Sequence, residues 1–296
     1  MSNANIKRLT IAALFAIAST STYAADLSVP IMPQPIEVSG WYLRGDIGFS
    51  NQNVGSLFNS DYSGYTTVTS VDKGFDAAPL FGLGIGYAFN HWLRVDVTGE
   101  YRGAANFHGL DVGTLPGPCL VGSGPCFAAD RYTASKSEWT FLFNGYVDLG
   151  TWYNFTPFVG AGVGASRNTI SNFGDFTTCL DSSNCVSPGP NNGGGSDAFA
   201  GTASTWNFAW ALHAGLAYQL SRNVTIELAY RYIDLGNARS GDEIAFNGGN
   251  SSFNPMEFNH LTSNDVKLGL RFNFGGDDFD RPRPVYVPPP PLNSRG

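Results

Sequence analysis

The chain has 296 residues and a formal net charge of −7, and only 14% of its residues are charged, compared with about 25% in ordinary soluble domains. The acidic balance argues against a nucleic-acid partner, because phosphate binding needs Lys and Arg. Beyond the N-terminal segment the sequence also excludes a membrane-spanning helix, since no stretch approaches the roughly 18 consecutive apolar residues that such a helix requires.

Residues 1–24 have the three parts of a secretory signal peptide. The basic pair Lys7-Arg8 precedes an apolar run over 9–18, and small residues then lead to a cleavage site after Ala24. The apolar run is too short for a transmembrane helix, which needs about 20 residues. We predict that an extended, proline-containing segment, residues 25–38, follows the signal peptide.

Eight later segments alternate between apolar and polar or small residues, which is the period of a β-strand with two unlike faces. Each has about ten residues or more, the length that a tilted strand needs to cross a bilayer. The segments are 40–50, 79–89, 91–102, 138–150, 156–166, 205–220, 224–236 and 264–274.

Long and short connections alternate strictly between these segments. The short ones lie at Asn90-His91, 151–154 and 221–223. This alternation puts all long loops at one end of an up-and-down meander and both chain ends at the other, as in outer-membrane barrels. The sequence therefore predicts an all-β, eight-stranded antiparallel up-and-down transmembrane β-barrel over residues 39–275. Its predicted long loops are 51–76, 103–136, 167–204 and 237–262.

The polar faces of the segments are expected to point into the barrel. An eight-stranded barrel is only wide enough for side chains to fill it, and a mutually neutralising set of charges is tolerable there. A soluble ligand-binding barrel would instead turn apolar residues inward. The network is interpreted as a plug, with a narrow conducting path as the alternative. Its members are Arg44, Arg94, Arg102, Arg231, Lys267 and Arg271, against Asp46, Asp96, Glu100, Glu138, Asp148 and Glu227.

All four cysteines fall in predicted outer loops. After export the environment is oxidising, so the local pairs Cys119–Cys126 and Cys179–Cys185 are the expected disulfides. A zinc site is the alternative, but the spacings exceed the usual two to four residues. The disulfides would stiffen the long loops.

Catalytic and cofactor motifs are not evident. His213 is predicted inside the barrel as a hydrogen-bonding partner, whereas His108 and His260 lie on or beside loops, where a haem or metal contact is a minor alternative. No His/Ser/acid arrangement can be placed from the sequence. We predict no enzyme activity, no metal and no cofactor, and a lipid-modifying enzyme is the weakest alternative.

The C-terminal residues 276–296 are polar and then rich in proline. Such a sequence favours an extended polyproline II tail. We expect this tail to be a solvated periplasmic spacer, with a contact segment for a periplasmic or cell-wall partner as the alternative.

The sequence resembles a known family of bacterial proteins. The signal peptide and the segments "GWYLRGDIGFS", "PFVGAGVGAS", "LAYRYIDLG" and "VKLGLRFNF" are similar to the opacity-type, eight-stranded outer-membrane surface proteins of α-proteobacteria. The resemblance covers about residues 38 to 274, loops excluded. A last strand ending in Phe274 also resembles the signal read by the outer-membrane assembly machinery, although a tail follows here.

The resemblance implies a structural or surface-exposed protein of the Gram-negative outer membrane, with adhesion, haem binding or envelope integrity as roles of some members. The implied partners are outer-membrane lipid and lipopolysaccharide, the assembly machinery, and an extracellular ligand or host surface that the loops would bind. A small porin-like channel conducting ions or small solutes is the alternative function. The resemblance supplies no catalytic residues.

Overall fold

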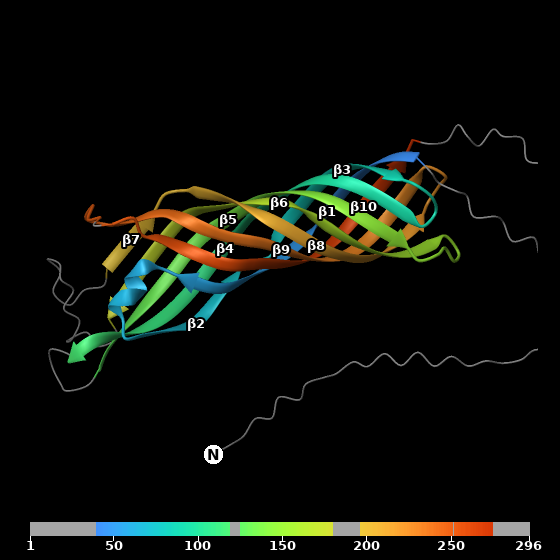
Figure 1. The fold of residues 1–296 in the computed structure, drawn as a ribbon. Helices are drawn as coiled ribbons and strands as arrows, with labels where there is room; N and C mark the ends of the chain where they lie inside the picture. Colours follow the sequence, from blue (N-terminus) through green and yellow to red (C-terminus); the bar gives the residue numbers. More distant parts are fainter. Residues whose placement is uncertain (1–39, 119–124, 180–195, 251, 275–296) are drawn as a thin grey trace, which may run out of the picture. The chain divides into compact units, whose positions relative to one another are not determined.

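The computed structural model describes residues 40–118, 125–179, 196–250 and 252–274 (Figure 1). No helix in these ranges is long and apolar enough to cross a membrane. The elements within them are β1 (Gly40–Phe58), η1 (Ser60–Gly64), β2 (Thr67–Phe75), β3 (Ala78–Ala88), β4 (Leu93–Pro118), β5 (Pro125–Asp148), β6 (Phe155–Cys179), β7 (Ser196–Ala200), β8 (Ala203–Gln219), β9 (Val224–Ala245) and β10 (Pro255–Asn273).

Eight of the strands form a closed antiparallel ring. β1 pairs with β3 and β10, β4 joins β3 to β5, β6 joins β5 to β8, and β9 joins β8 to β10. The first residues of β1 and the end of β10 lie at the same end of the barrel, where Phe274 N donates to Trp41 O at 2.9 Å (Figure 1). The predicted all-β, eight-stranded, up-and-down barrel is confirmed.

The strands continue well beyond the predicted segments, and in this respect the prediction of long loops was wrong. β4 and β5 occupy most of 103–136, and β6 runs on to Cys179. We call the eight predicted segments the lower barrel. The outer extension is the strand structure beyond them, namely β2, β7 and residues 51–58, 103–118, 125–137, 167–179, 203–204, 237–245 and 255–263.

β2 and β7 belong only to the outer extension. β2 pairs with β4, for example Phe75 with Phe107, and β7 lies between β6 and β9. In Figure 1 both strands lie at the end opposite to the barrel's short turns.

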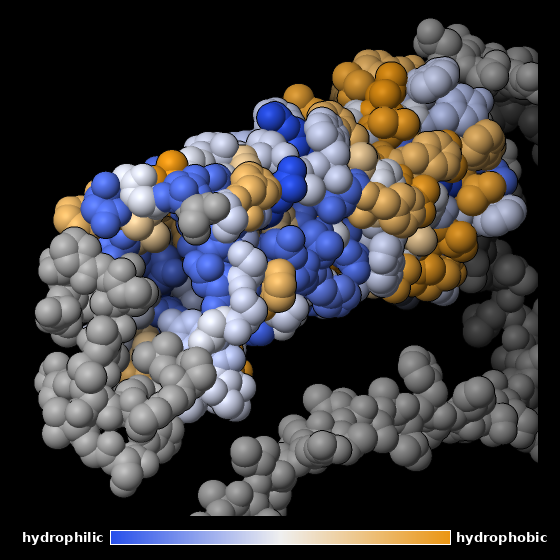
Figure 2. Space-filling view, turned by 60° about the vertical axis from the view of Figure 1, so that its left-hand side comes forward, coloured by the Kyte–Doolittle hydropathy of each residue, from blue (hydrophilic) through white to orange (hydrophobic). Residues whose placement is uncertain are grey.

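The two parts turn opposite faces to their surroundings. Around the lower barrel the outward side chains are large and apolar, such as Leu83 and Phe208, while the inward ones are polar. In the outer extension Phe107 and Phe258 are buried inside, while Asn106 and Arg239 are exposed outside. Figure 2 shows this change as an apolar surface over one end of the barrel and a hydrophilic surface over the other.

β-bulges produce this change of face. On β4, Arg102 pairs with Glu138 but the next paired residue, Ala105, faces Lys136, so β4 contains one extra residue. An extra residue shifts the inward set from one parity to the other. β6, β9 and β10 have similar irregularities, and three residues with positive φ lie there: Asn172 (51°), Gly236 (73°) and His260 (57°).

Candidate functional site

The interior of the lower barrel holds all twelve charged residues of the predicted network. Ten of them are buried, and the side chains of Asp148 and Arg271 are each 13% exposed. They come from β1, β4, β5, β9 and β10, whose inward positions converge on one narrow space. Small residues on the intervening strands make room for them, since a Cβ at Gly84 would lie 3.0 Å from Cγ of Arg44.

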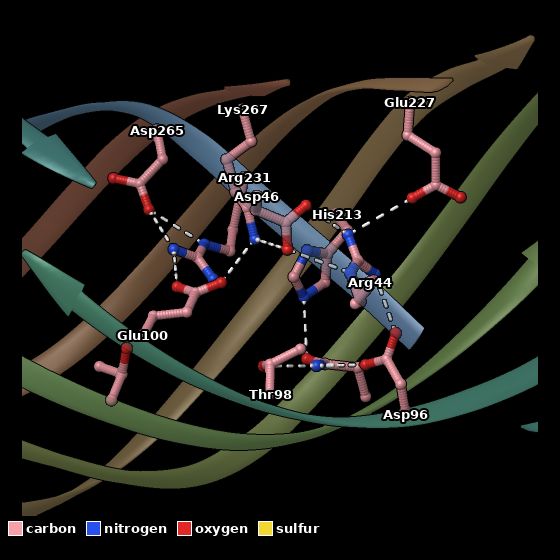
Figure 3. A network of polar contacts seen from close by, with 12 residues as sticks. Arg44, Asp46, Asp96, Thr98, Glu100, His213, Glu227, Arg231, Asp265 and Lys267 are labelled. Carbon is pink, nitrogen blue, oxygen red and sulfur yellow. Dashed lines mark hydrogen bonds and ion pairs between the residues drawn. The ribbon is translucent and has the colours of Figure 1, made fainter. Parts of the chain in front are cut away.

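One part of the network centres on Arg44 and Glu227 (Figure 3). Arg44 donates from Nη2 to Asp46 Oδ1 at 2.9 Å and from Nη1 to Asp96 Oδ2 at 2.8 Å. Glu227 lies 3.3 Å from a guanidinium nitrogen of each of Arg44, Arg94 and Arg271. One carboxylate thus serves three cations, which ties β1, β4 and β10 to β9.

A second part centres on Arg231 and Asp265. Arg231 Nη2 lies 2.6 Å from Glu100 Oε2 and 2.6 Å from Asp265 Oδ2 (Figure 3). Asp265 also accepts from Arg102 Nη2 at 2.7 Å, and Lys267 Nζ donates to Glu100 Oε1 at 2.5 Å. Each of these charges therefore has more than one opposite partner, the arrangement that makes buried ions tolerable.

The predicted list omitted two members of this network, Lys136 and Asp265, and both are buried completely. Lys136 contacts Glu138 and donates to Gln52 Oε1 at 2.7 Å. With these two residues the network has seven basic and seven acidic side chains. Lys136 could have been predicted, because the alternation of polar and apolar residues continues N-terminally from Glu138. Asp265 lies on the polar face of the last predicted segment, so the same pattern indicated it.

His213 joins the network through a hydrogen bond with Asn144. It is buried, and its Nε2 lies 3.2 Å from Asn144 Oδ1. Asn144 Nδ2 in turn donates to Asp96 Oδ1 at 2.8 Å and to Thr98 Oγ1 at 3.1 Å. His213 therefore lies where the sequence placed it, inside the barrel.

A layer of aromatic rings lies next to the charge network on the outer side. We call Phe75, Phe107, Tyr132, Phe173 and Phe258 the aromatic layer, and all five are buried. Ring centroids of Phe107 and Phe258 are 5.0 Å apart, and those of Phe173 and Phe258 are 6.3 Å apart. These rings come from β4, β10 and β6, so they meet across the interior. The layer also contacts the network, because Lys136 Nζ lies 5.9 Å from the Phe75 ring centre.

Beyond the aromatic layer the interior carries several carboxylates. Asp111 accepts from the Tyr62 hydroxyl at 2.6 Å, and Glu243 accepts from Asn59 Nδ2 at 2.8 Å. Burial and the neighbouring carboxylates raise the pKa of Asp175 to about 8, and burial together with Asp61 does the same for the pKa of Glu243. These groups were missed because the sequence assigned their segments to loops.

The cysteine prediction is not tested by the described side chains. Cys119 and Cys185 lie outside the described residues. Only the backbone of Cys126 and Cys179 is placed, and these residues pair with Leu115 on β4 and Ala128 on β5, respectively. The pairings Cys119–Cys126 and Cys179–Cys185 therefore stay predictions.

The two loop histidines lie on the outside of the outer extension or at its edge. His108 Nε2 is 3.8 Å from Asp72 Oδ2, and His260 Nδ1 is 3.7 Å from Asp234 Oδ2. Within the ranges that the structure describes, no three His, Cys, Asp or Glu residues are grouped as a metal ion would require.

An apolar outer surface around a charged interior defines a class of protein. Side chains such as Leu83, Phe208 and Leu268 would be costly to expose to water as a continuous band, but they suit contact with lipid tails. Aromatic residues flank this band at both ends, for example Trp41 and Phe274 at one and Trp139 and Trp206 at the other. The lower barrel is therefore a transmembrane β-barrel.

Comparison with known proteins identifies the family. The model of the outer membrane protein beta-barrel domain matches residues 10–274, and the chain belongs to this family. An uncharacterised protein of Brucella suis biovar 1 is 32% identical over 282 residues, covering 85% of this chain and 92% of the relative. A putative adhesin of Rickettsia bellii is 27% identical over 266 residues, covering 88% and 98%.

Among solved structures, neisserial surface protein A is 14% identical, with a TM-score of 0.42 and coverage of 80% of this chain and 98% of that one. The family assignment confirms the predicted resemblance to bacterial surface barrels and the location in the Gram-negative outer membrane. Outer-membrane barrels have their short turns on the periplasmic side, so the outer extension of this barrel is extracellular.

Proposed function

We propose that the chain is a non-enzymatic surface protein whose outer extension presents a rigid recognition surface outside the cell, while the lumen stays closed. The observation that carries the proposal is the second core inside the outer extension, built around Phe107 and Phe258. A protein that only spanned the membrane would need no such core. The similarity to a putative adhesin supports an extracellular ligand or host surface as the partner.

The physical argument for recognition is preorganisation. Flexible loops lose conformational freedom on binding, at about 1–2 kcal/mol for each residue's backbone. Strands that are already paired and packed have lost it on folding, so more of the contact energy contributes to affinity. The predicted disulfides would add to this stiffening at the ends of β5 and β6.

The argument for a closed lumen rests on two successive barriers. The charge network is buried and its members pair with one another, so an ion would have to displace existing partners. The aromatic layer beyond it offers no polar groups except the Tyr132 hydroxyl, and an ion crossing apolar side chains loses its hydration without replacement. A conducting path is the alternative.

The proposal includes no catalytic activity and no cofactor. The buried carboxylates and guanidinium groups of the lower barrel are committed to one another, and only Asp148 and Arg271 reach solvent in part. The remaining expectations lie outside the described residues: the signal peptide 1–24, the segment 25–38 and the tail 276–296. They remain proposals, as do contacts with lipopolysaccharide, the assembly machinery and a periplasmic partner.

Recognition is tested by displaying the full chain on a non-adherent bacterium and measuring attachment to cultured epithelial cells. The matched control replaces 104–135 by a short turn, which removes the β4–β5 hairpin of the outer extension but leaves the lower barrel. Gel mobility before and after boiling establishes that both fold. We expect attachment only with the full chain. Equal attachment by both folded proteins would contradict the proposal.

Closure is tested separately by recording single-channel current of the refolded chain in a planar lipid bilayer. Folded wild-type protein should give no current steps. Reproducible steps that change on Arg94→Ala or Glu100→Ala would mean that the network lines a pore.

A further inference from the structure

The lipid-facing surface of the lower barrel ends in an unusual residue, Arg167. It directly follows the predicted segment 156–166 on β6, and it is exposed between the buried side chains of Ser166 and Asn168. Its side chain therefore faces outward, whereas the charges of the network face inward. Asp234 on β9 is another charged residue of the barrel wall outside the network, and its side chain is 18% exposed.

Asp234 and Arg167 differ in whether their charged groups have partners within the protein. Asp234 accepts from Gly236 N at 2.9 Å and has His260 within 3.7 Å. Arg167 has no hydrogen-bond or ion-pair partner in the described part of the chain. A guanidinium that carries five donors is thus presented to the outer edge of the membrane without an internal partner.

Aromatic rings surround Arg167 on the membrane side. In the strand register it lies directly between Trp139 on β5 and Trp206 on β8. The ring of Phe141 lies 6.3 Å from that of Trp139 and 6.3 Å from that of Trp206, in stacked orientations. Phe141 pairs with Ala165, the outward residue before Arg167 on β6, so the three rings form an arc that begins beside the arginine and continues on its membrane side.

Hydroxyl groups lie on the other side, away from the membrane. Thr169 is the next outward residue on β6, and its register partners are Ser137 and Ser204. Thr169 Oγ1 and Ser204 Oγ are 2.9 Å apart. A cation therefore lies between an aromatic arc, which suits acyl chains, and a row of hydroxyls, which suits the phosphate-bearing sugars of a glycolipid headgroup.

We propose that Arg167, with Ser137, Thr169 and Ser204, binds the phosphate of a glycolipid headgroup in the outer leaflet. Arginine pairs with phosphate through two parallel N–H donors, and the hydroxyls can complete the contact. Tryptophans are favoured at the headgroup level, where their rings contact the upper acyl chains. The site gives a residue-level location to the predicted lipopolysaccharide partner, and it does not depend on what the rest of the outer extension binds.

The competing explanation is that Arg167 only extends its charged group into water and binds no ligand. An arginine near a bilayer surface is tolerated at a cost of only about 0–1 kcal/mol, because its head reaches water. That explanation predicts no preference for phosphate.

The test uses the full chain refolded in phosphatidylcholine vesicles that contain a minor fraction of diphosphoryl lipid A. The protein is extracted in mild detergent, and the lipid A that remains bound is quantified by mass spectrometry. We expect Arg167→Gln to weaken retention by about tenfold, the loss of one charge-assisted hydrogen-bonded contact. Arg167→Lys should retain part of the binding, because it keeps the charge but not the fork.

Arg239→Gln is the matched control, because Arg239 is also an exposed arginine but pairs with Glu257 on β10 and not with a residue of the proposed site. It should retain lipid A like the wild type, and inorganic phosphate at the same concentration should not displace the lipid. Gel mobility before and after boiling establishes folding of each variant. Equal retention by Arg167→Gln and wild type would overturn the proposal. So would an equal loss in Arg239→Gln, or an equal loss of phosphatidylcholine on Arg167→Gln.

Discussion

The lower barrel and the outer extension consist largely of the same strands, yet they turn opposite faces to their interiors. In the lower barrel the interior is ionic, with Arg231 and Asp265 at 2.6 Å, and the exterior is apolar. In the outer extension the interior is aromatic and the exterior is polar. The face that a strand buries therefore follows the solvent around it, lipid in one case and water in the other.

The difference also shows how little sequence is needed to exchange the faces. One extra residue between Arg102 and Ala105 moves the inward set of β4 from charged positions to apolar ones. On β5 the same alternate positions point inward along the whole strand. The inward residues change from the charged Glu138 and Lys136 to the apolar Ala134 and Tyr132 because the residue types change. Bulges and composition are thus two routes to the same reversal.

The largest expected effect comes from breaking the ionic interior. Asp265→Ala leaves Arg102 and Arg231 without a shared acceptor, and removing one partner of a buried ion pair costs about 3–5 kcal/mol. We expect the free energy of unfolding in urea, followed by tryptophan fluorescence in lipid vesicles, to fall by this amount. Asp197→Ala, at an exposed position on β7, is the control and should change it little. Similar values for the two variants would mean that the network contributes little.

Breaking the aromatic interior should have a more local effect. Phe258 contacts Phe75, Phe107 and Phe173, and Phe258→Ala should remove about 3 kcal/mol from the packing of the outer extension. Hydrogen exchange should accelerate in β2 and β7, while amides near Glu227 stay protected. Phe253→Ala serves as the control, because Phe253 is exposed. A uniform acceleration along all strands would show that the two parts unfold as one unit.

The acidic interior of the outer extension predicts a pH dependence that the lower barrel does not share. The pKa of Asp175 is raised from 3.8 to about 8 and that of Glu243 from 4.5 to about 8, in both cases chiefly by burial. The unfolded chain releases these protons at lower pH than the folded one, so this contribution to stability is complete near pH 4 and is lost as the pH rises through 8.

We therefore expect limited proteolysis to cut the outer extension faster at pH 9 than at pH 5, with the lower barrel protected at both. Asp175→Asn should flatten this dependence, because the amide does not ionise. Asp197→Asn is the control, since Asp197 is exposed on β7. Faster cleavage at pH 5 than at pH 9 would contradict the assignment.

The contrast between the lower barrel and the outer extension also explains which parts of the fold could be predicted from the sequence. The lower barrel was accessible because lipid requires apolar residues at every second position, so the pattern around Leu83 and Leu268 is regular. The outer extension was read as loops because its outward residues are small or polar and its bulges interrupt the alternation, as in "YRGAANFHG" (101–109). The pairing of Arg102 with Asp265, 163 positions apart, depends on strand register around the closed barrel, which no local pattern encodes.

The smallest expected effect concerns the bulge at His260, where the two parts meet. His260 has φ 57°, a left-handed conformation that side chains other than glycine adopt at a cost. His260→Gly removes this cost but adds flexibility to the unfolded chain, so we expect a net gain of about 0.5–1 kcal/mol in the free energy of unfolding. His260→Ala keeps the Cβ and should give no gain, which separates backbone strain from loss of the imidazole near Asp234. A gain in both variants would mean that the side chain, and not the left-handed backbone, is what destabilises the bulge.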